Sequence, residues 1–306
     1  MVDLYWRIGC YLSKHVAASE WGKGVVTELA NYISINVPKV KGFSAQNLWR
    51  MKQFYEVYAE NEKLSALLRE ISWTNNVTIF SQAKSAEERE FYIRLTIKEH
   101  LSSRDLERQF KACVFERSML SETKLSPVVR ELLPMAEDVF KDQYVLEFIT
   151  GKEAKPENSL RHALITKMKT FILELGKDFI FIDQEYPLQV GNQDFRIDLL
   201  FYHRELQCLV AFELKTDTFQ PEYLGKLNFY LEALDRDVKK SKENPSIGVL
   251  LCKSKDNEVV EYALSRSMSP TMVAEYQLHL PDKKLLQQRM AELFEQAEEE
   301  VGEENL

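Results

Sequence analysis

Three charged residues lie in or at the end of apolar segments of this 306-residue chain. Asp198 lies inside the apolar run Ile197–Phe201, and Glu213 and Lys215 end the run Leu209–Lys215. Charged side chains are rarely buried unless they are paired or bind a metal. Two carboxylates and a lysine at the ends of adjacent strands are the components of a magnesium-dependent phosphodiesterase site.

Strand geometry predicts how these residues meet. Side chains alternate between the two faces of a strand, so Glu213 and Lys215 share a face, and Ile197 points away from Asp198. Residues 204–207 are short enough for a hairpin connection, which can place Asp198 opposite Glu213. Two adjacent carboxylates repel each other, and a cation such as Mg²⁺ normally stabilises the pair. Lys215 would then orient or deprotonate the attacking water, or stabilise charge on the phosphorus.

The triplet Glu-x-Lys is a weak signal by itself. It occurs three times, at Glu122–Lys124, Glu153–Lys155 and Glu213–Lys215. Only the third ends an apolar strand, and only the third follows a strand that contains an aspartate. The alternative is a buried salt bridge among the same charges, with Arg196 as a further cation. Local sequence leaves the metal site and the salt bridge equally supported.

Composition favours a soluble globular protein of two domains, with 45% hydrophobic and 29% charged residues. No apolar run approaches the roughly 20 residues of a membrane helix, and the first residues do not resemble a secretory signal. We therefore expect no membrane partner. The cysteines are far apart, without C-x-x-C spacing, and are read as reduced thiols of a cytoplasmic protein. They are Cys10, Cys113, Cys208 and Cys252.

The net charge of -8 arises largely at the end of the chain, which is acidic and has no basic residue after Arg289. Without this tail the chain is nearly neutral, so net charge neither supports nor excludes nucleic-acid binding. We expect the acidic tail, residues 291–306, to be the solvated end of a helix that begins near Asp282. A partner-binding role is the alternative.

Periodicity divides the chain into domains. Residues 1–148 are predicted to be helical, and the polar residues 149–157 to be a linker. Residues 158–290 mix strands and helices, which predicts one α/β domain with a central mixed sheet covered on both faces. The expected elements are helices at 159–175, 221–234 and 257–264, and strands at 179–182, 196–202, 208–214, 247–252 and 272–278.

The helical region contains two candidate helix-turn-helix arrangements. In the first, Pro38 and Gly42 interrupt the helical pattern and Ser44 is a good N-cap for the next helix. That helix would present Asn47 and Arg50 to DNA.

The second arrangement begins with a capping box of Ser85 and Glu88, which opens a helix to about residue 100. After a short break, Ser103 can cap a further helix that would present Arg104 and Arg108. Ordinary helical hairpins have the same layout and remain the alternative for both arrangements.

An aspartate, then Glu-x-Lys at a strand end, then a helix resembles the PDDEXK nuclease superfamily. The chain is most similar to its YhcG-type subfamily, and the run DLLFYHREL, which starts at Asp198, is highly specific. The resemblance covers nearly the whole chain. In the nuclease domain it involves residues 198–210, 212–215, 219–231, 260–264 and 274–278, and in the helical domain residues 5–9, 21–22, 41–44, 47–48 and 103–109.

This resemblance implies a restriction-endonuclease-like fold and a magnesium-dependent endonuclease acting on DNA, with Mn²⁺ able to substitute. Asp198, Glu213 and Lys215 fall on the motif, and the metal would be held by Asp198, Glu213 and Leu214. The superfamily often adds a glutamate from the preceding helix. Glu174 is our candidate, and a plain exposed helix residue is the alternative.

Related nucleases often carry a Q-x-x-x-Y pattern in the following helix. Here the pattern is Lys226 to Tyr230, with lysine where glutamine is usual. Lysine still offers a donor to phosphate but loses the acceptor of glutamine. Tyr223 and Tyr230 are either substrate contacts or packing residues, and Gln184 is a weaker candidate for a DNA contact.

Our leading expectation is an endonuclease whose helical domain targets it to DNA. The alternative is a catalytically silent nucleic-acid-binding or assembly module, which would usually have lost one of the three motif residues. Neither a glycine-rich phosphate loop nor a G-x-S-x-G motif occurs, so we expect no organic cofactor and no serine hydrolase. Cutting both strands with one site per chain needs two sites, which makes a homodimer a candidate assembly.

Overall fold

The structure is a computed structural model that describes residues 1–17 and 23–304. The chain forms two compact units, Met1–Phe110 and Lys111–Leu306. The first unit is helical and the second contains a mixed sheet with helices, which confirms the predicted fold class. The segment 149–157, proposed above as a linker, lies in the second unit, where Ile149 and Ala154 are buried in the core.

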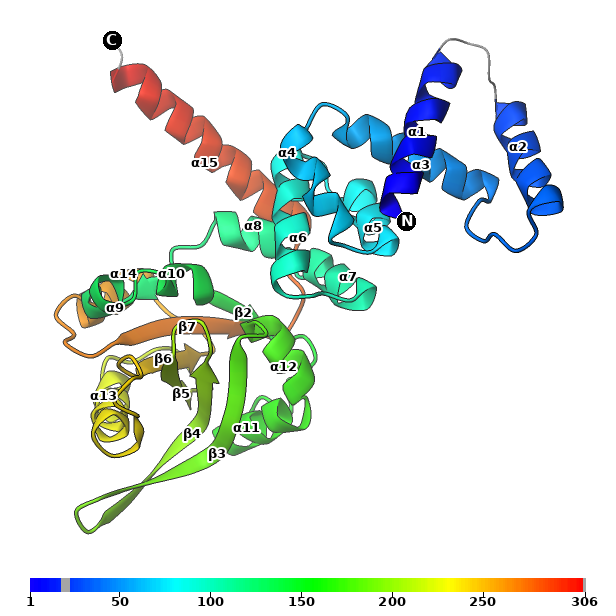
Figure 1. The fold of residues 1–306 in the computed structure, drawn as a ribbon. Helices are drawn as coiled ribbons and strands as arrows, with labels where there is room; N and C mark the ends of the chain where they lie inside the picture. Colours follow the sequence, from blue (N-terminus) through cyan, green and yellow to red (C-terminus); the bar gives the residue numbers. More distant parts are fainter. Residues whose placement is uncertain (18–22, 305–306) are drawn as a thin grey trace. The chain divides into compact units, whose positions relative to one another are not determined.

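The first unit consists of helices and one 3-10 turn (Figure 1). As expected, Ser44 caps α3, and its hydroxyl accepts a hydrogen bond from the backbone N–H of Asn47 at 3.3 Å. The elements are α1 (Val2–Ala17), α2 (Lys23–Asn36), α3 (Ala45–Tyr58), α4 (Glu62–Ser65), the 3-10 turn η1 (Leu67–Arg69), α5 (Trp73–Gln82), α6 (Ala86–Lys98) and α7 (Ser103–Lys111).

The caps of α6 and α7 differ in one respect from the prediction. Ser85 caps α6 by accepting from the N–H of Glu88, as predicted. The cap of α7 is Ser102, one residue before the predicted Ser103. Its hydroxyl accepts from the Asp105 N–H at 3.3 Å, while the Asp105 carboxylate accepts from the Ser102 N–H. This reciprocal pair satisfies two free N–H groups at once, which explains why the helix starts there.

The second unit is organised around a sheet with the strand order β1-β7-β6-β5-β4-β3, with β2 also beside β7. Strands β5, β6 and β7 are parallel, while β3, β4 and β5 form an antiparallel meander, so the sheet is mixed as predicted. The strands are β1 (Lys124–Leu125), β2 (Gln143–Val145), β3 (Phe179–Val190), β4 (Gln193–His203), β5 (Cys208–Leu214), β6 (Ile247–Cys252) and β7 (Thr271–Gln277).

Strands β3 and β4 are longer than expected and continue as a two-stranded hairpin past the other strands (Figure 1). Strands β1 and β2 lie in the region that periodicity marked as helical. They have two and three residues, too few for an alternating pattern to be recognised, and they pair only with β7.

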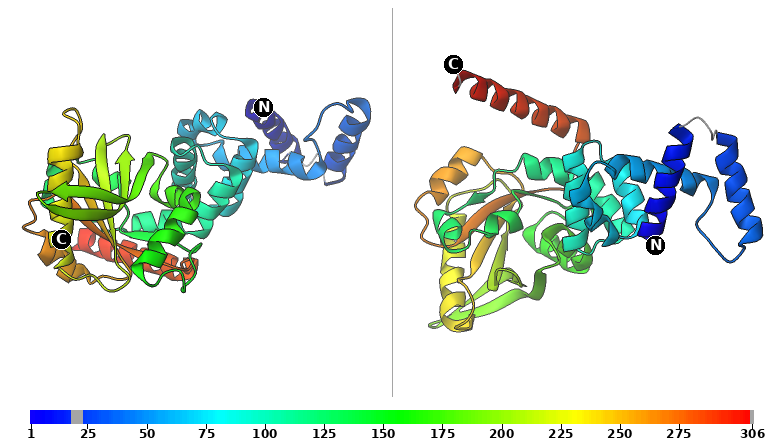
Figure 2. Two further views of the ribbon diagram at one scale, coloured as in Figure 1. Left: turned by 90° about the horizontal axis from the view of Figure 1, so that it is seen from below. Right: turned by 45° about the horizontal axis from the view of Figure 1, so that its top comes forward.

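Helices cover both faces of the sheet, as predicted (Figure 2). On one face Phe171 packs with Phe201 and Phe212 of the sheet. On the other, Leu227 and Tyr230 pack with strand residues that include Leu200, Ala211 and Leu250. The helices are α8 (Val114–Met119), α9 (Pro127–Leu132), α10 (Ala136–Val139), α11 (Glu157–Thr166), α12 (Met168–Leu175), α13 (Tyr223–Ala233) with a π-helical turn (Leu234–Val238), α14 (Asn257–Leu264) and α15 (Lys283–Glu304).

The helix predicted at 159–175 is two helices, α11 and α12, which meet at Lys167. The ammonium of Lys167 donates to the carbonyl of Phe148 at 2.6 Å and pairs with Glu153. This interaction fixes the break, and no glycine or proline marks it in the sequence. The helix at the end of the chain begins at the predicted place, with Asp282 as its cap. None of the helices in the described ranges could cross a membrane.

Candidate active site

The two predicted carboxylates meet where β4 and β5 separate. The last paired residues of these strands are Leu199 and Phe212, and the same register would place Asp198 opposite Glu213. The backbone N–H of Leu214 donates to Oδ2 of Asp198 at 2.9 Å, which ties the two strand ends together. Two acidic side chains therefore lie side by side at the carboxyl end of β5.

Glu213 is almost fully buried, with 1% of its surface exposed. Its Oε1 accepts a hydrogen bond from the ammonium of Lys226 at 2.6 Å and lies 3.3 Å from that of Lys215. Its Oε2 is buried and has no hydrogen-bond partner. Burial and the neighbouring Asp198 charge raise the pKa of Glu213, although the two lysines oppose them. This carboxylate is thus incompletely satisfied.

Lys215 lies between the carboxylates of Glu213 and Glu157. Its ammonium is 3.1 Å from Oε1 of Glu157 and lies 5.1 Å from the centre of the Tyr223 ring. Burial alone would lower the pKa of Lys215, but the two glutamates outweigh it and the pKa is raised. Lys215 is consequently a cation at neutral pH.

Asp198 is held from the other side by α11. Nη1 of Arg161 donates to Oδ1 of Asp198 at 2.8 Å, and Nη2 lies 3.0 Å from the Glu185 carboxylate. Strict alternation fails just before this point. Ile197 packs in the same core as Leu200, whereas alternation would place these two residues on opposite faces. Strand β4 stays paired with β3 on both sides of this position, and the local irregularity at Asp198 lets its side chain face α11.

Helix α13 contributes the basic and aromatic wall of the site. The ammonium of Lys226 is half exposed and lies 5.3 Å from the centre of the Tyr230 ring, and Glu213 outweighs burial to raise its pKa to about 12. The hydroxyl of Tyr223 donates to Asp217 at 2.8 Å, and this bond raises the pKa of Tyr223 to about 12. Tyr230 is 2% exposed, so packing accounts for most of its surface.

Glu174, the predicted helix glutamate, occupies a different cluster. It lies in α12 and is fully buried, so it is not the exposed helix residue considered as the alternative. It also does not lie beside Asp198. Its carboxylate accepts from both terminal nitrogens of Arg117 at 3.1 and 3.2 Å and from the N–H of Val145 at 3.0 Å. The helix break at Lys167 separates Glu174 from α11, the helix that reaches the site.

The helix glutamate that the structure brings to Lys215 is Glu157, and it was missed in the sequence together with Arg161 and Glu185. Glu157 and Arg161 are four residues apart and so share a face of α11. That spacing was the available signal. It could be interpreted only once α11 was known to end at Thr166.

The proposed DNA contacts lie in different surroundings. Gln184 is exposed on β3. It pairs with Leu199, which is the residue after Asp198 on β4. Asn47 is already engaged, since its amide donates to the Gly42 carbonyl and accepts from the Trp73 indole. Of the remaining candidates, Arg50 and Arg104 are exposed and Arg108 is half-buried.

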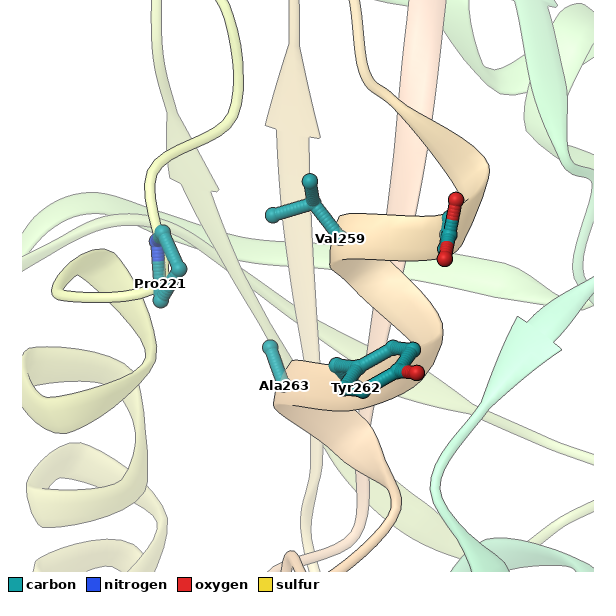
Figure 3. Close-up of a pocket in the computed structure, with 5 residues that line it drawn as sticks. Pro221, Val259, Tyr262 and Ala263 are labelled. Carbon is teal, nitrogen blue, oxygen red and sulfur yellow. The ribbon is translucent and has the colours of Figure 1, made fainter.

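A surface pocket of about 470 Å³ lies between α14 and the start of α13 (Figure 3). Its lining is Pro221, Glu258, Val259, Tyr262 and Ala263. It contains no basic residue and none of the site carboxylates, so it does not favour a nucleic-acid phosphate.

The residues present fit a divalent cation in part. No group of three or more His, Cys, Asp and Glu side chains in the described ranges is arranged to hold a metal. However, Mg²⁺ is commonly held by one or two carboxylates and retains several waters. Asp198, Glu213 and the carbonyl of Leu214 match that requirement, and the unpartnered Oε2 of Glu213 is an available ligand.

Both parts of the chain are similar to known protein domains. Residues 137–291 match the family model of the YhcG PDDEXK nuclease domain, and residues 1–117 match that of the DUF1016 N-terminal domain. A protein of Escherichia coli (strain K12) named "Putative nuclease YhcG" is 30% identical over 305 residues, covering 88% of this chain and 80% of that protein.

A looser similarity is to the crystal structure of a repair endonuclease from Pyrococcus abyssi, with 16% identity and a TM-score of 0.28. It covers 41% of this chain, which spans about half of the endonuclease chain.

The family match over residues 137–291 places the chain in the PDDEXK nuclease class, and the mixed sheet with helices on both faces is consistent with it. Within that class, the chain belongs to the YhcG family.

Proposed function

We propose that this protein is a Mg²⁺-dependent endonuclease that hydrolyses phosphodiester bonds of DNA. The observation that carries the proposal is the convergence of Asp198, Glu213 and Lys215 at the end of β5, with one buried carboxylate oxygen unpartnered. A salt-bridged structural site would be expected to satisfy that oxygen, because an unpaired buried acceptor costs about 1–3 kcal/mol.

Asp198, Glu213 and the Leu214 carbonyl would hold the cation, and Mn²⁺ would substitute for Mg²⁺. When bound, the cation would favour ionisation of a water and neutralise charge on the phosphodiester. The protein's own contribution is to hold both carboxylates close together. The N–H of Leu214 and the Arg161 guanidinium hold Asp198, and Lys226 and Lys215 hold Glu213.

Lys215 acts as a donor in this proposal. With a raised pKa it keeps its proton at neutral pH, so it is poorly suited to remove a proton from water. Its ammonium instead orients the attacking water and stabilises negative charge on the phosphate oxygens. Of the roles considered for Lys215 from the sequence, orienting the water and stabilising charge are favoured over deprotonating the water.

The test is cleavage of supercoiled plasmid, single-stranded DNA, branched DNA and RNA by the full chain, in Mg²⁺ and in EDTA. We expect cleavage of at least one DNA substrate in Mg²⁺, none in EDTA, and a loss of at least about 100-fold in Asp198→Asn. Glu122→Gln is the matched control, because Glu122 belongs to an exposed Glu-x-Lys pair. Cleavage that persists in EDTA or in Asp198→Asn contradicts the proposal, and cleavage of RNA alone contradicts the choice of DNA.

One observation favours a second candidate, a catalytically silent nucleic-acid-binding or assembly module. The carboxylates have internal cations in Arg161, Lys215 and Lys226, so the site is largely neutralised without a metal. Thermal unfolding distinguishes the candidates, because a cation that binds the folded state stabilises it. The endonuclease should melt at a higher temperature in Mn²⁺, whereas Asp198→Ala should not respond. A silent module predicts no response in either protein.

A further inference from the structure

Arg161 links the active-site aspartate to two partners outside the PDDEXK motif. Its Nη1 donates to Oδ1 of Asp198 at 2.8 Å. Its Nη2 lies 3.0 Å from Oε1 of Glu185 and donates to Oδ1 of Asn158 at 3.0 Å. The Arg161 side chain is 13% exposed, so the guanidinium is largely withdrawn from water.

In this arrangement each oxygen of Asp198 already accepts a hydrogen bond. Oδ2 accepts from the N–H of Leu214 and Oδ1 accepts from Arg161. A divalent cation at Oδ1 would lie only a few ångströms from the guanidinium charge, and at partly buried sites such repulsion amounts to several kcal/mol. Glu213 differs, because its Oε2 carries no partner. A cation can therefore coordinate Oε2 of Glu213 without displacing a hydrogen bond, whereas at Asp198 it meets the charge of Arg161, which favours the departure of Arg161.

The pair of Arg161 and Asp198 is also less enclosed than the buried pair of Arg117 and Glu174 in the same unit. Arg117 and Glu174 have side chains that are 8% and 0% exposed. Arg161 and Asp198 are 13% and 12% exposed, and the second acidic partner, Glu185, is 45% exposed. Arg161 thus has a second, partly exposed acidic partner in Glu185, whereas Arg117 and Glu174 lie in the interior.

We infer that Arg161 is a substrate-positioning residue that neutralises Asp198 in the metal-free site and transfers to a DNA phosphate when the divalent cation binds. The inference rests on the proposed function. A guanidinium presents parallel N–H donors that match the oxygens of a phosphate as well as those of a carboxylate. The substrate phosphodiester therefore offers Arg161 an equivalent partner, and the cation takes its place on Asp198.

A thermodynamic consequence follows, because DNA and metal both favour the state in which Arg161 has left Asp198. Each ligand must then raise the affinity for the other by the same factor, typically about 5- to 150-fold for coupled sites. Removing the guanidinium should relieve the competition in the absence of DNA and should abolish the coupling.

The experiment is a titration of the full chain with Mn²⁺, followed by electron paramagnetic resonance, with and without a short DNA duplex. The Mn²⁺ bound by the duplex alone is subtracted, and a gel confirms that the duplex stays intact. We expect the duplex to tighten Mn²⁺ binding to the wild type at least about 5-fold. Arg161→Met should bind Mn²⁺ more tightly than the wild type without DNA, and the duplex should add little.

Glu185→Gln removes one ion-pair partner of Arg161 but keeps the guanidinium. It should tighten Mn²⁺ binding without DNA, but less than Arg161→Met does. Arg130→Met is the matched control, since Arg130 forms an exposed pair with Glu137, and it should behave as the wild type. If Arg161→Met and Glu185→Gln both bind Mn²⁺ more weakly than the wild type, Arg161 only supports Asp198 and the inference fails while the metal site stands. A wild type that binds no Mn²⁺ even with the duplex overturns the inference and the proposed metal site together.

Discussion

At the residue scale, the site is governed by one buried carboxylate with competing neighbours. Glu213 has lost nearly all contact with water and lies beside Asp198, and the two lysines only partly offset these effects. A raised pKa means that the folded protein binds this proton more readily than the unfolded chain does. The free energy of unfolding therefore falls as pH rises from the unfolded value of 4.5 through the folded value.

Glu213→Gln should consequently stabilise the metal-free protein at neutral pH, because glutamine resembles the protonated side chain. Its melting temperature in EDTA should exceed that of the wild type at pH 7.5, and the difference should shrink as the pH falls toward 4.5. Glu122→Gln should show neither effect. A lower melting temperature for Glu213→Gln at pH 7.5 would mean that the lysines outweigh burial and that the direction assigned to this pKa is wrong.

At the element scale, short segments with clear boundaries could be predicted and the helix that reaches the site could not. The limits of β5, β6 and α14 match the sequence expectation because each is a short run bounded by polar or breaking residues. The contact of Asp198 with Leu214 follows from the hairpin that β4 and β5 form. Glu157 and Arg161 were missed because the break at Lys167 depends on tertiary contacts with Phe148 and Glu153, which local patterns do not report.

The position of α13, which carries Lys226, depends on close packing against β6 at Gly248. A Cβ atom on Gly248 would lie 2.7 Å from the Cγ atom of Leu227, so Gly248→Ala must push the helix away. We expect a loss of about 1–3 kcal/mol in the free energy of unfolding, measured by urea denaturation. Gly225→Ala on the same helix is the control. A Cβ there meets nothing within 4 Å, so this change should be neutral or stabilising by up to about 1 kcal/mol.

An unchanged stability in Gly248→Ala would show that α13 can shift without cost. In that case the packing of α13 against Gly248 would not be what holds the ammonium of Lys226 at 2.6 Å from Glu213.

At the scale of the whole molecule, we propose that the first unit binds DNA and that the second cleaves it. The family models match the two parts of the chain separately, residues 1–117 and 137–291. In the first unit Asn47 is engaged in holding its own turn, so exposed arginines such as Arg104 are the better candidates for DNA contacts. An arginine that contacts phosphate contributes affinity without sequence preference.

Arg104→Ala should therefore weaken binding of duplex DNA about equally for unrelated sequences and reduce the slope of log affinity against log salt by about 1. Fluorescence anisotropy in EDTA at several salt concentrations measures both quantities without cleavage. Arg94→Ala serves as control, because Arg94 is similarly exposed but paired with Glu90. An unchanged salt slope in Arg104→Ala would remove α7 from the proposed DNA-binding surface.

The most direct test of the central claim is the single-turnover rate of DNA cleavage in Mg²⁺ by the wild type and by Glu213→Gln. Both proteins should be folded, and the variant should be at least as stable as the wild type in EDTA, so a lost rate reports on chemistry. We predict Mg²⁺-dependent cleavage by the wild type and a rate at least about 100-fold lower in the variant. Equal rates in the two proteins would contradict the assignment of the active site to the end of β5.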